Sequence, residues 1–209
     1  MVKSISIQQN DFSVKRIFLQ IKTQFPFLHY LVIVHVVGLI FCWIAIQVDD
    51  RQLTGINVWA KPTKFYLSTI ILLWTVGWYL LRYPFSKISK QIISIGLTLL
   101  LTFENILISI QASRGVKSHY NTTTPFDAAI FASMGFAVGL ITLYMIWFLI
   151  KSFSSELNFS KSMKWGFRIA WLALLFGTAA GGGAMLEQNA HSVGVADGGS
   201  GIPLLNWST

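Results

Sequence analysis

One short stretch of the sequence, SRGVKSHYNTTTPFD, holds several side chains that can bind ligands or transfer protons. They are Arg114, His119, Tyr120, Asn121 and Asp127. An imidazole next to a guanidinium and a carboxylate can bind an anion, coordinate a metal ion or pass on a proton. Asp127 also has a local explanation, because a carboxylate in the first turn of a helix suits the helix dipole. Arg114 and His119 have no such local reason, so we take this stretch as a candidate ligand pocket.

A carboxylate interrupts the long apolar stretch LTFENILIS. Burying the charge of Glu104 in a membrane-spanning helix costs several kcal/mol, so such a residue usually faces the interior of a helix bundle. Gln111 follows seven residues later and therefore lies on the same helix face. Two interpretations stay open: a carboxyl group that carries protons or binds a ligand, or a structural hydrogen bond between helices.

Two further segments contribute candidate pocket residues. The segment NVWAKPTKF supplies Trp59 and Lys61; this lysine either pairs with a carboxylate or an anionic ligand, or anchors a helix end at the interface. The glycine-rich end of the chain supplies Glu187, His191 and Asp197. We interpret that end as a loop packed over the bundle like a lid, with a disordered tail as the alternative.

The sequence leaves metal binding and catalysis undecided. His119 and His191 are the candidate metal ligands, yet no His-Glu-x-x-His motif and no cysteine pair accompanies them. No phosphate-binding loop, dinucleotide fingerprint or serine–histidine–acid order is present. The sequence therefore names no cofactor and no reaction.

The elements that position these residues are long apolar helices. Of 209 residues 54% are hydrophobic and 11% are charged, far below the ~25% charged residues of soluble domains. We expect an all-α transmembrane bundle with five spans, each of at least roughly 20 residues. The predicted spans are 27–48, 64–83, 91–112, 127–150 and 164–186. Small residues four apart, as at Gly135 and Gly139, predict close helix approach in the fourth span.

Basic residues predict the orientation of the bundle. Eleven lie on one side of the predicted spans and five on the other, and the excess marks the cytoplasm, so the N-terminus is inside and the C-terminus outside. The eleven are Lys3, Lys15, Arg16, Lys22, Arg82, Lys87, Lys90, Lys151, Lys161, Lys164 and Arg168; the five are Arg51, Lys61, Lys64, Arg114 and Lys117. This distribution explains the net charge of +8 without a nucleic-acid partner. Residues 1–26 form a cytoplasmic amphipathic segment, residues 27–186 the bundle, and residues 187–209 the extracytoplasmic tail.

Three segments resemble a family of uncharacterised bacterial multi-pass membrane proteins. The motifs are Trp-x-Lys-Pro at residues 59–62, Arg-Gly-x-x-Ser-His-[Tyr/Phe]-Asn at residues 114–121, and His-[Ser/Thr]-Val-Gly-x-x-Asp-Gly-Gly at residues 191–199. The resemblance runs over most of the chain from about residue 55 and implies a bacterial cytoplasmic (inner) membrane. Members of that family continue beyond the Trp-Ser of the third segment. The chain is therefore either a short member or lacks helices that complete the site.

All three motif segments are predicted to lie on the outer side of the membrane. We therefore expect a binding or accessory protein with a polar pocket at that face. The alternatives are an intramembrane enzyme or redox protein that uses the histidines and Glu104, and a pathway for protons or small solutes. The lipid bilayer is the expected partner, and a second membrane protein or a second copy of the chain stays open.

Overall fold

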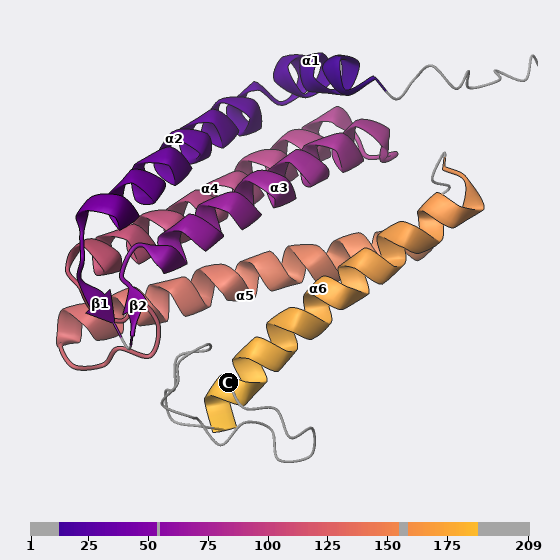
Figure 1. The fold of residues 1–209 in the computed structure, drawn as a ribbon. Helices are drawn as coiled ribbons and strands as arrows, with labels where there is room; N and C mark the ends of the chain where they lie inside the picture. Colours follow the sequence, from indigo (N-terminus) through magenta and orange to yellow (C-terminus); the bar gives the residue numbers. More distant parts are fainter. Residues whose placement is uncertain (1–12, 54, 155–158, 188–209) are drawn as a thin grey trace, which may run out of the picture.

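Six helices and one small β-hairpin make up the part of the chain that the structure, a computed structural model, describes (Figure 1). This part covers residues 13–53, 55–154 and 159–187, with residues 180–187 as backbone only. The elements are α1 (Val14–Gln24), α2 (Pro26–Val48), β1 (Gln52–Leu53), β2 (Ile56–Asn57), α3 (Ala60–Arg82), α4 (Lys87–Ser113), α5 (Pro125–Ser154) and α6 (Lys161–Glu187). The predicted all-α class is confirmed.

Four of these helices are long and apolar enough to cross a membrane: α2, α3, α4 and α5. They coincide with the first four predicted spans, so a multi-pass membrane protein is confirmed in its broad form. The fifth predicted span falls on α6, which is not among the four. The side chains of α6 are described only for residues 161–179, the part that holds Lys161, Lys164 and Arg168, so this finding does not include its apolar C-terminal end. A fifth crossing stays a prediction.

Local signals start and end these helices. Pro26 occupies the first turn of α2, where its missing N–H would have no partner in any case. The hydroxyl of Thr124 accepts a hydrogen bond from the backbone N–H of Asp127 (3.1 Å) and so caps α5. Gly115 ends α4 with a φ of 70°, and the N–H groups of Gly115 and Val116 donate to the carbonyls of Ala112 and Gln111. This Schellman motif needs a residue that tolerates positive φ, which explains the glycine after Arg114.

The helices pack in the order in which they follow one another. α2, α3 and α4 lie side by side, α5 packs on α4, and α6 packs on α5. The main core is rich in aromatic side chains: Tyr79 of α3 contacts Tyr83, Phe148 and Trp171, and Phe148 stacks on Trp171 with ring centroids 5.0 Å apart. These aromatic residues thus serve helix packing.

One flank of α4 carries polar side chains that face α3. Thr98 and Asn105 are fully buried, and Asn105 Nδ2 donates to Thr69 Oγ1 (2.8 Å). One turn further on, Ser109 Oγ lies 3.2 Å from the hydroxyl of Tyr66. Because hydrocarbon offers these groups no partner, such bonds hold helices together within a membrane.

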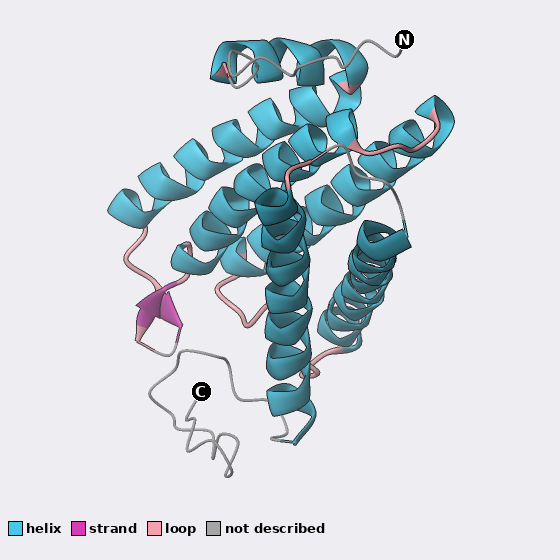
Figure 2. Cartoon of the chain, turned by 90° about the vertical axis from the view of Figure 1, so that its right-hand side faces the viewer, coloured by secondary structure: helices cyan, strands magenta, loops and turns pink. Residues whose placement is uncertain are grey.

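The helix α1 and the β-hairpin lie at opposite ends of the bundle (Figures 1 and 2). Ile21 of α1 is fully buried and lies against Gly77 of α3, where a Cβ would come within 3.3 Å of the isoleucine. The described part of the predicted amphipathic segment thus forms a helix, with Ile21 facing the bundle. Gly135 and Gly139 are exposed, and a Cβ at either would meet nothing within 4 Å in the described part of the chain. Close helix approach at these glycines is thus not found there.

Candidate functional site

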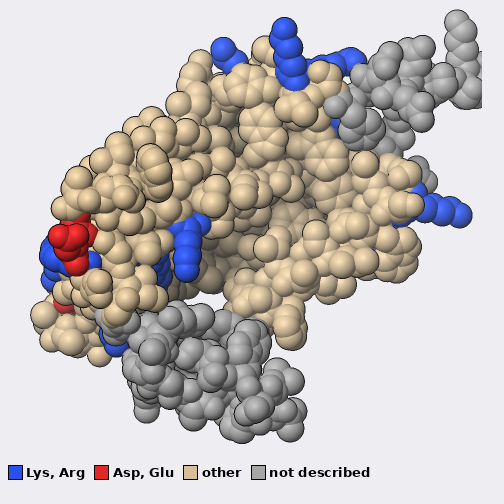
Figure 3. All heavy atoms as spheres, viewed as in Figure 1, with Lys and Arg blue, Asp and Glu red and all other residues tan. Residues whose placement is uncertain are grey.

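The polar side chains predicted to form a pocket gather at one end of the bundle. This hairpin end consists of the β1–β2 hairpin, the first turn of α3, the last turns of α4, the α4–α5 loop (residues 114–124) and the first turn of α5. Charged side chains cluster on it (Figure 3). Contacts divide its residues into three groups, which we call the lysine cluster, the arginine cluster and the hairpin cluster.

The lysine cluster joins Lys61 of α3, Glu104 of α4 and His119 of the α4–α5 loop. Lys61 Nζ lies 3.1 Å from His119 Nδ1, and His119 Nε2 lies 3.9 Å from Glu104 Oε1. Glu104 is 7% exposed. Phe65, one turn after Lys61, packs against the same imidazole at 6.2 Å between ring centroids. Two predicted motif segments, those of Trp59–Pro62 and Arg114–Asn121, therefore meet in this cluster.

The hydrogen bonds of His119 define its tautomer. The ammonium of Lys61 donates to Nδ1, and the hydroxyl of Ser118 lies 3.0 Å from the same atom. Nδ1 is thus the acceptor, and in a neutral ring Nε2 carries the proton and faces Glu104. Burial, and secondly the charge of Lys61, lower the pKa of His119 to about 3. The imidazole is therefore neutral at physiological pH.

The lysine cluster has unused hydrogen-bonding capacity. An ammonium group has three N–H donors, and within the described part of the chain only one of them has a partner, Nδ1 of His119. The sole polar contact found there for the carboxylate of Glu104 is His119 Nε2 at 3.9 Å, which is too long for a hydrogen bond. A half-buried lysine and a buried glutamate with free donors and acceptors can receive a further polar group.

The arginine cluster, by contrast, is saturated. Asp127 is 2% exposed; its Oδ1 accepts from Arg114 Nη1 and from Gln111 Nε2, and its Oδ2 accepts from Thr124 Oγ1. Arg114 also donates to Gln111 Oε1 and lies over the ring of Phe126. With every carboxylate oxygen bonded, this cluster fastens the end of α4 to the start of α5.

The hairpin cluster was not predicted as a site. Asp49, directly after α2, accepts hydrogen bonds from Arg51 Nη2 (2.7 Å) and Trp59 Nε1 (2.8 Å). These donors, Arg51 first, hold the pKa of Asp49 well below its usual range. Arg51 Nη1 also donates to the carbonyl of Ser113, which ties the hairpin to α4. Trp59, a predicted pocket residue, is thus engaged in this structural contact. The sequence signal for this cluster is the segment VDDR (residues 48–51), in which an acidic and a basic side chain lie two positions apart.

The two remaining described pocket residues shape the α4–α5 loop. Asn121 is buried; its side chain donates to the Lys117 carbonyl and accepts from the N–H of Thr123. Tyr120 has a φ of 56° and is the one non-glycine residue with positive φ in the described ranges. Its ring packs on Phe131 at 4.6 Å between centroids. Of the predicted pocket residues in the tail, His191 and Asp197 lie outside the described residues, and so does the side chain of Glu187.

The described residues contain no cluster of side chains that could hold a metal ion. Among the described residues no three His, Cys, Asp or Glu side chains come together. The Nδ1 lone pair of His119 is occupied by Lys61 and Ser118, so only its Nε2 side faces another ligand-type group, Glu104. The role of His191 as a metal ligand stays a prediction.

Comparison with known proteins finds no matching family model, no matching curated protein and no matching solved structure. The fold and the site therefore define only a class of protein: a multi-pass helical membrane protein with a partly buried lysine–histidine–glutamate cluster at one end of its bundle.

Proposed function

We propose that the protein is a membrane-embedded binding protein that holds a small polar ligand at the lysine cluster. The observation that carries this proposal is the difference between the clusters: the carboxylates of Asp127 and Asp49 are saturated with donors, whereas Lys61 and Glu104 are not. Desolvating charged groups without full hydrogen bonding costs free energy. A ligand that supplies the missing hydrogen-bond partners of Lys61 and Glu104 explains why the protein keeps these groups unsaturated.

The chemistry of the cluster specifies the ligand class. Lys61 offers N–H donors on one side of the His119 imidazole, and Glu104 offers acceptor oxygens on the other. A ligand that bridges them carries an acceptor and a donor on the same small molecule, as in an amino-acid zwitterion, a primary amide or a vicinal diol. A simple anion would satisfy Lys61 but would meet the like charge of Glu104.

The proposed setting is the outer face of a bacterial cytoplasmic membrane. The hairpin end carries the five basic residues predicted to face outward, and the other eleven are predicted to lie on the cytoplasmic side. The resemblance to bacterial multi-pass membrane proteins supports the same setting, since its first two motif segments supply Lys61 and His119 of one cluster. A proton pathway is disfavoured because the core toward the α1 end is filled with apolar and aromatic side chains such as Tyr79, Phe148 and Trp171.

Thermal stabilisation of the protein in nanodiscs tests the proposal. A panel of amino acids, amides, polyols and carboxylates is screened for compounds that raise the unfolding temperature. We expect at least one amphoteric or neutral bridging compound to stabilise the wild type and Lys64→Met, but neither Lys61→Met nor Glu104→Gln. Lys64 is the matched control because it is exposed and lies one turn further along α3. Equal stabilisation of all four proteins, or of none, would overturn the proposal. Turnover of a bound compound would reveal an enzyme instead.

A further inference from the structure

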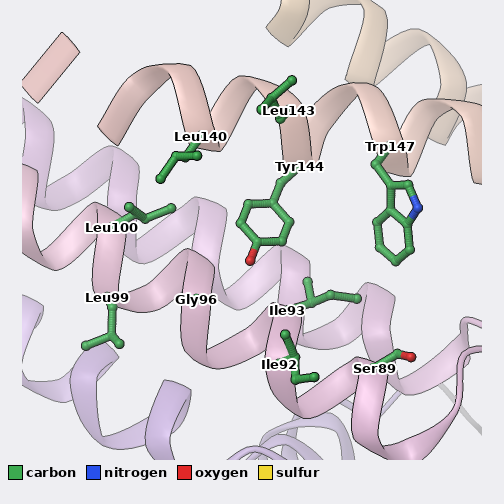
Figure 4. A pocket seen from close by; sticks show the side chains of 10 residues that line it. All are labelled: Ser89, Ile92, Ile93, Gly96, Leu99, Leu100, Leu140, Leu143, Tyr144 and Trp147. Carbon is green, nitrogen blue, oxygen red and sulfur yellow. The ribbon is translucent and has the colours of Figure 1, made fainter. Parts of the chain in front are cut away.

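A hollow lies on the side of the bundle, between α4 and α5 and away from the lysine cluster. Its volume is about 730 Å³, within the ~300–1,000 Å³ typical of ligand pockets. Its lining is apolar except for Ser89 and Tyr144, and most of it comes from leucine and isoleucine side chains. Tyr144 and Trp147 project from α5 toward α4 (Figure 4). We call this hollow the α4–α5 groove.

A close contact fixes the register of the two helices in the groove. A Cβ added at Gly96 of α4 would lie 2.6 Å from the hydroxyl oxygen of Tyr144 of α5, so these two residues are level with each other. Consecutive helices joined by one short loop run in opposite directions. Ser89 lies seven residues before Gly96, and Lys151 lies seven residues after Tyr144. Ser89 and Lys151 are therefore level with each other, at the end of the groove nearer to α1.

The groove has the length of one acyl chain in one leaflet. Its lining on α4 extends from Ser89 to Leu100, which is about 16 Å at ~1.5 Å rise per residue. Half of the ~30 Å hydrocarbon core is about 15 Å. Because Ser89 lies two residues after the start of α4, a groove of this length fits the distance from the interface to the middle of the bilayer.

The end of the groove at Ser89 is polar and basic. Lys151 follows Trp147 by four residues and Tyr144 by seven, so it lies on the groove-facing side of α5. Ser89 lines the groove directly. A hydroxyl and an ammonium group at interface depth, above an apolar channel, match a phosphate headgroup above its acyl chain.

We propose that the α4–α5 groove binds one anionic phospholipid, with an acyl chain against Gly96, Leu100 and Leu140 and the headgroup phosphate at Ser89 and Lys151. The proposal is independent of the ligand of the lysine cluster. The bound phospholipid belongs to the leaflet at the α1 end of the bundle, where eleven of the sixteen basic residues are predicted to lie.

Quenching of tryptophan fluorescence by brominated lipid tests this proposal. The protein is reconstituted in phosphatidylcholine vesicles that contain increasing fractions of phosphatidylglycerol brominated in mid-chain. The contribution of Trp147 is the difference between the wild type and Trp147→Phe. The difference between the wild type and Trp165→Phe is the control, since Trp165 is an exposed residue of α6 outside the groove. We expect half-maximal quenching of Trp147 at a several-fold lower lipid fraction than that of Trp165.

Charge variants test the headgroup. Lys151→Glu and the milder Lys151→Gln should move the Trp147 quenching curve toward that of Trp165. Lys87→Glu should not, because Lys87 is an exposed residue at the same end of the bundle that does not line the groove. Identical curves for Trp147 and Trp165 would overturn the proposal, and so would equal quenching by brominated phosphatidylcholine. Absence of Trp147 quenching with either lipid would also overturn it and would indicate that a second copy of the chain fills the groove.

Discussion

The ammonium of Lys61 lies 3.1 Å from Nδ1 of His119, although 58 positions separate the two residues in the chain. This contact joins the first turn of α3 to the α4–α5 loop and directs the other imidazole nitrogen toward Glu104. Because the imidazole accepts from a cation, protonating it would remove the hydrogen bond and place two positive charges side by side.

The first prediction concerns pH. Burial and Lys61 lower the pKa of His119 to about 3 in the folded protein, whereas an unfolded histidine titrates near ~6.5. The unfolded chain thus binds more protons between these values, so the stability contributed by neutral His119 is present above about pH 6.5 and is lost as the pH falls toward 3. We expect acidification from about pH 7.5 to about pH 4.5 to lower the unfolding temperature by several degrees, measured by intrinsic fluorescence in nanodiscs. His119→Gln should show a smaller decrease; equal slopes for both proteins would refute the prediction.

The second prediction concerns the arginine cluster. Asp127→Asn keeps the shape of the side chain but removes the charge that Arg114 and Gln111 face. We expect a larger drop in unfolding temperature than for Asp49→Asn, because Asp127 is 2% exposed and Asp49 is 20% exposed at its side chain. In a double-mutant cycle, Arg114→Gln should add little further destabilisation to Asp127→Asn. Additive effects would show that the two residues do not interact.

The third prediction concerns the contact between α2 and α3. A Cβ at Gly38 would lie 2.6 Å from the ring of Tyr66, and that ring is held by Ser109 and by His35. Gly38→Ala should therefore destabilise the protein by ~1–3 kcal/mol, as overpacking does. The control is Gly139→Ala, where an added Cβ meets open space; it should be neutral or stabilise the helix by ~0.5–1 kcal/mol. Reversible unfolding in mixed micelles measures both, and a Gly38 variant as stable as the control would contradict the close contact.

The fourth prediction concerns orientation. The single cysteine, Cys42, is fully buried, so we expect little background labelling when new cysteines are introduced. Thr122→Cys lies on an exposed position of the α4–α5 loop, and Lys87→Cys lies on an exposed position at the opposite end. We expect a membrane-impermeant maleimide to label Thr122→Cys in intact cells and Lys87→Cys only after permeabilisation. The reverse pattern would place the lysine cluster on the cytoplasmic side.

Much of the fold follows from the sequence because lipid imposes simple rules. Apolar runs long enough to cross a membrane predicted α2 to α5 within a few residues. The expected burial of Glu104 followed from the cost of an exposed carboxylate in hydrocarbon.

The partition of the polar residues could not be predicted from sequence. Helix periodicity places Glu104 and Gln111 on one face, yet the structure assigns Gln111 to Asp127 and Glu104 to His119. That division depends on the path of the α4–α5 loop, which is set by Gly115, Asn121 and Tyr120 and not by any periodic pattern. The hairpin cluster was missed for a similar reason, since it needs the two-residue strands to bring Trp59 back to Asp49.

The left-handed backbone of Tyr120 has a consequence for how this loop tolerates change. For a residue with a side chain this conformation costs roughly 1–2 kcal/mol, and asparagine or glycine would adopt it more easily. A β-branched residue would fit worst, so valine or isoleucine at this position should swing His119 away from α3 without altering any group that bonds to it. The left-handed conformation of Tyr120 thus fixes the orientation of the neighbouring His119 and, through it, the geometry of the lysine cluster.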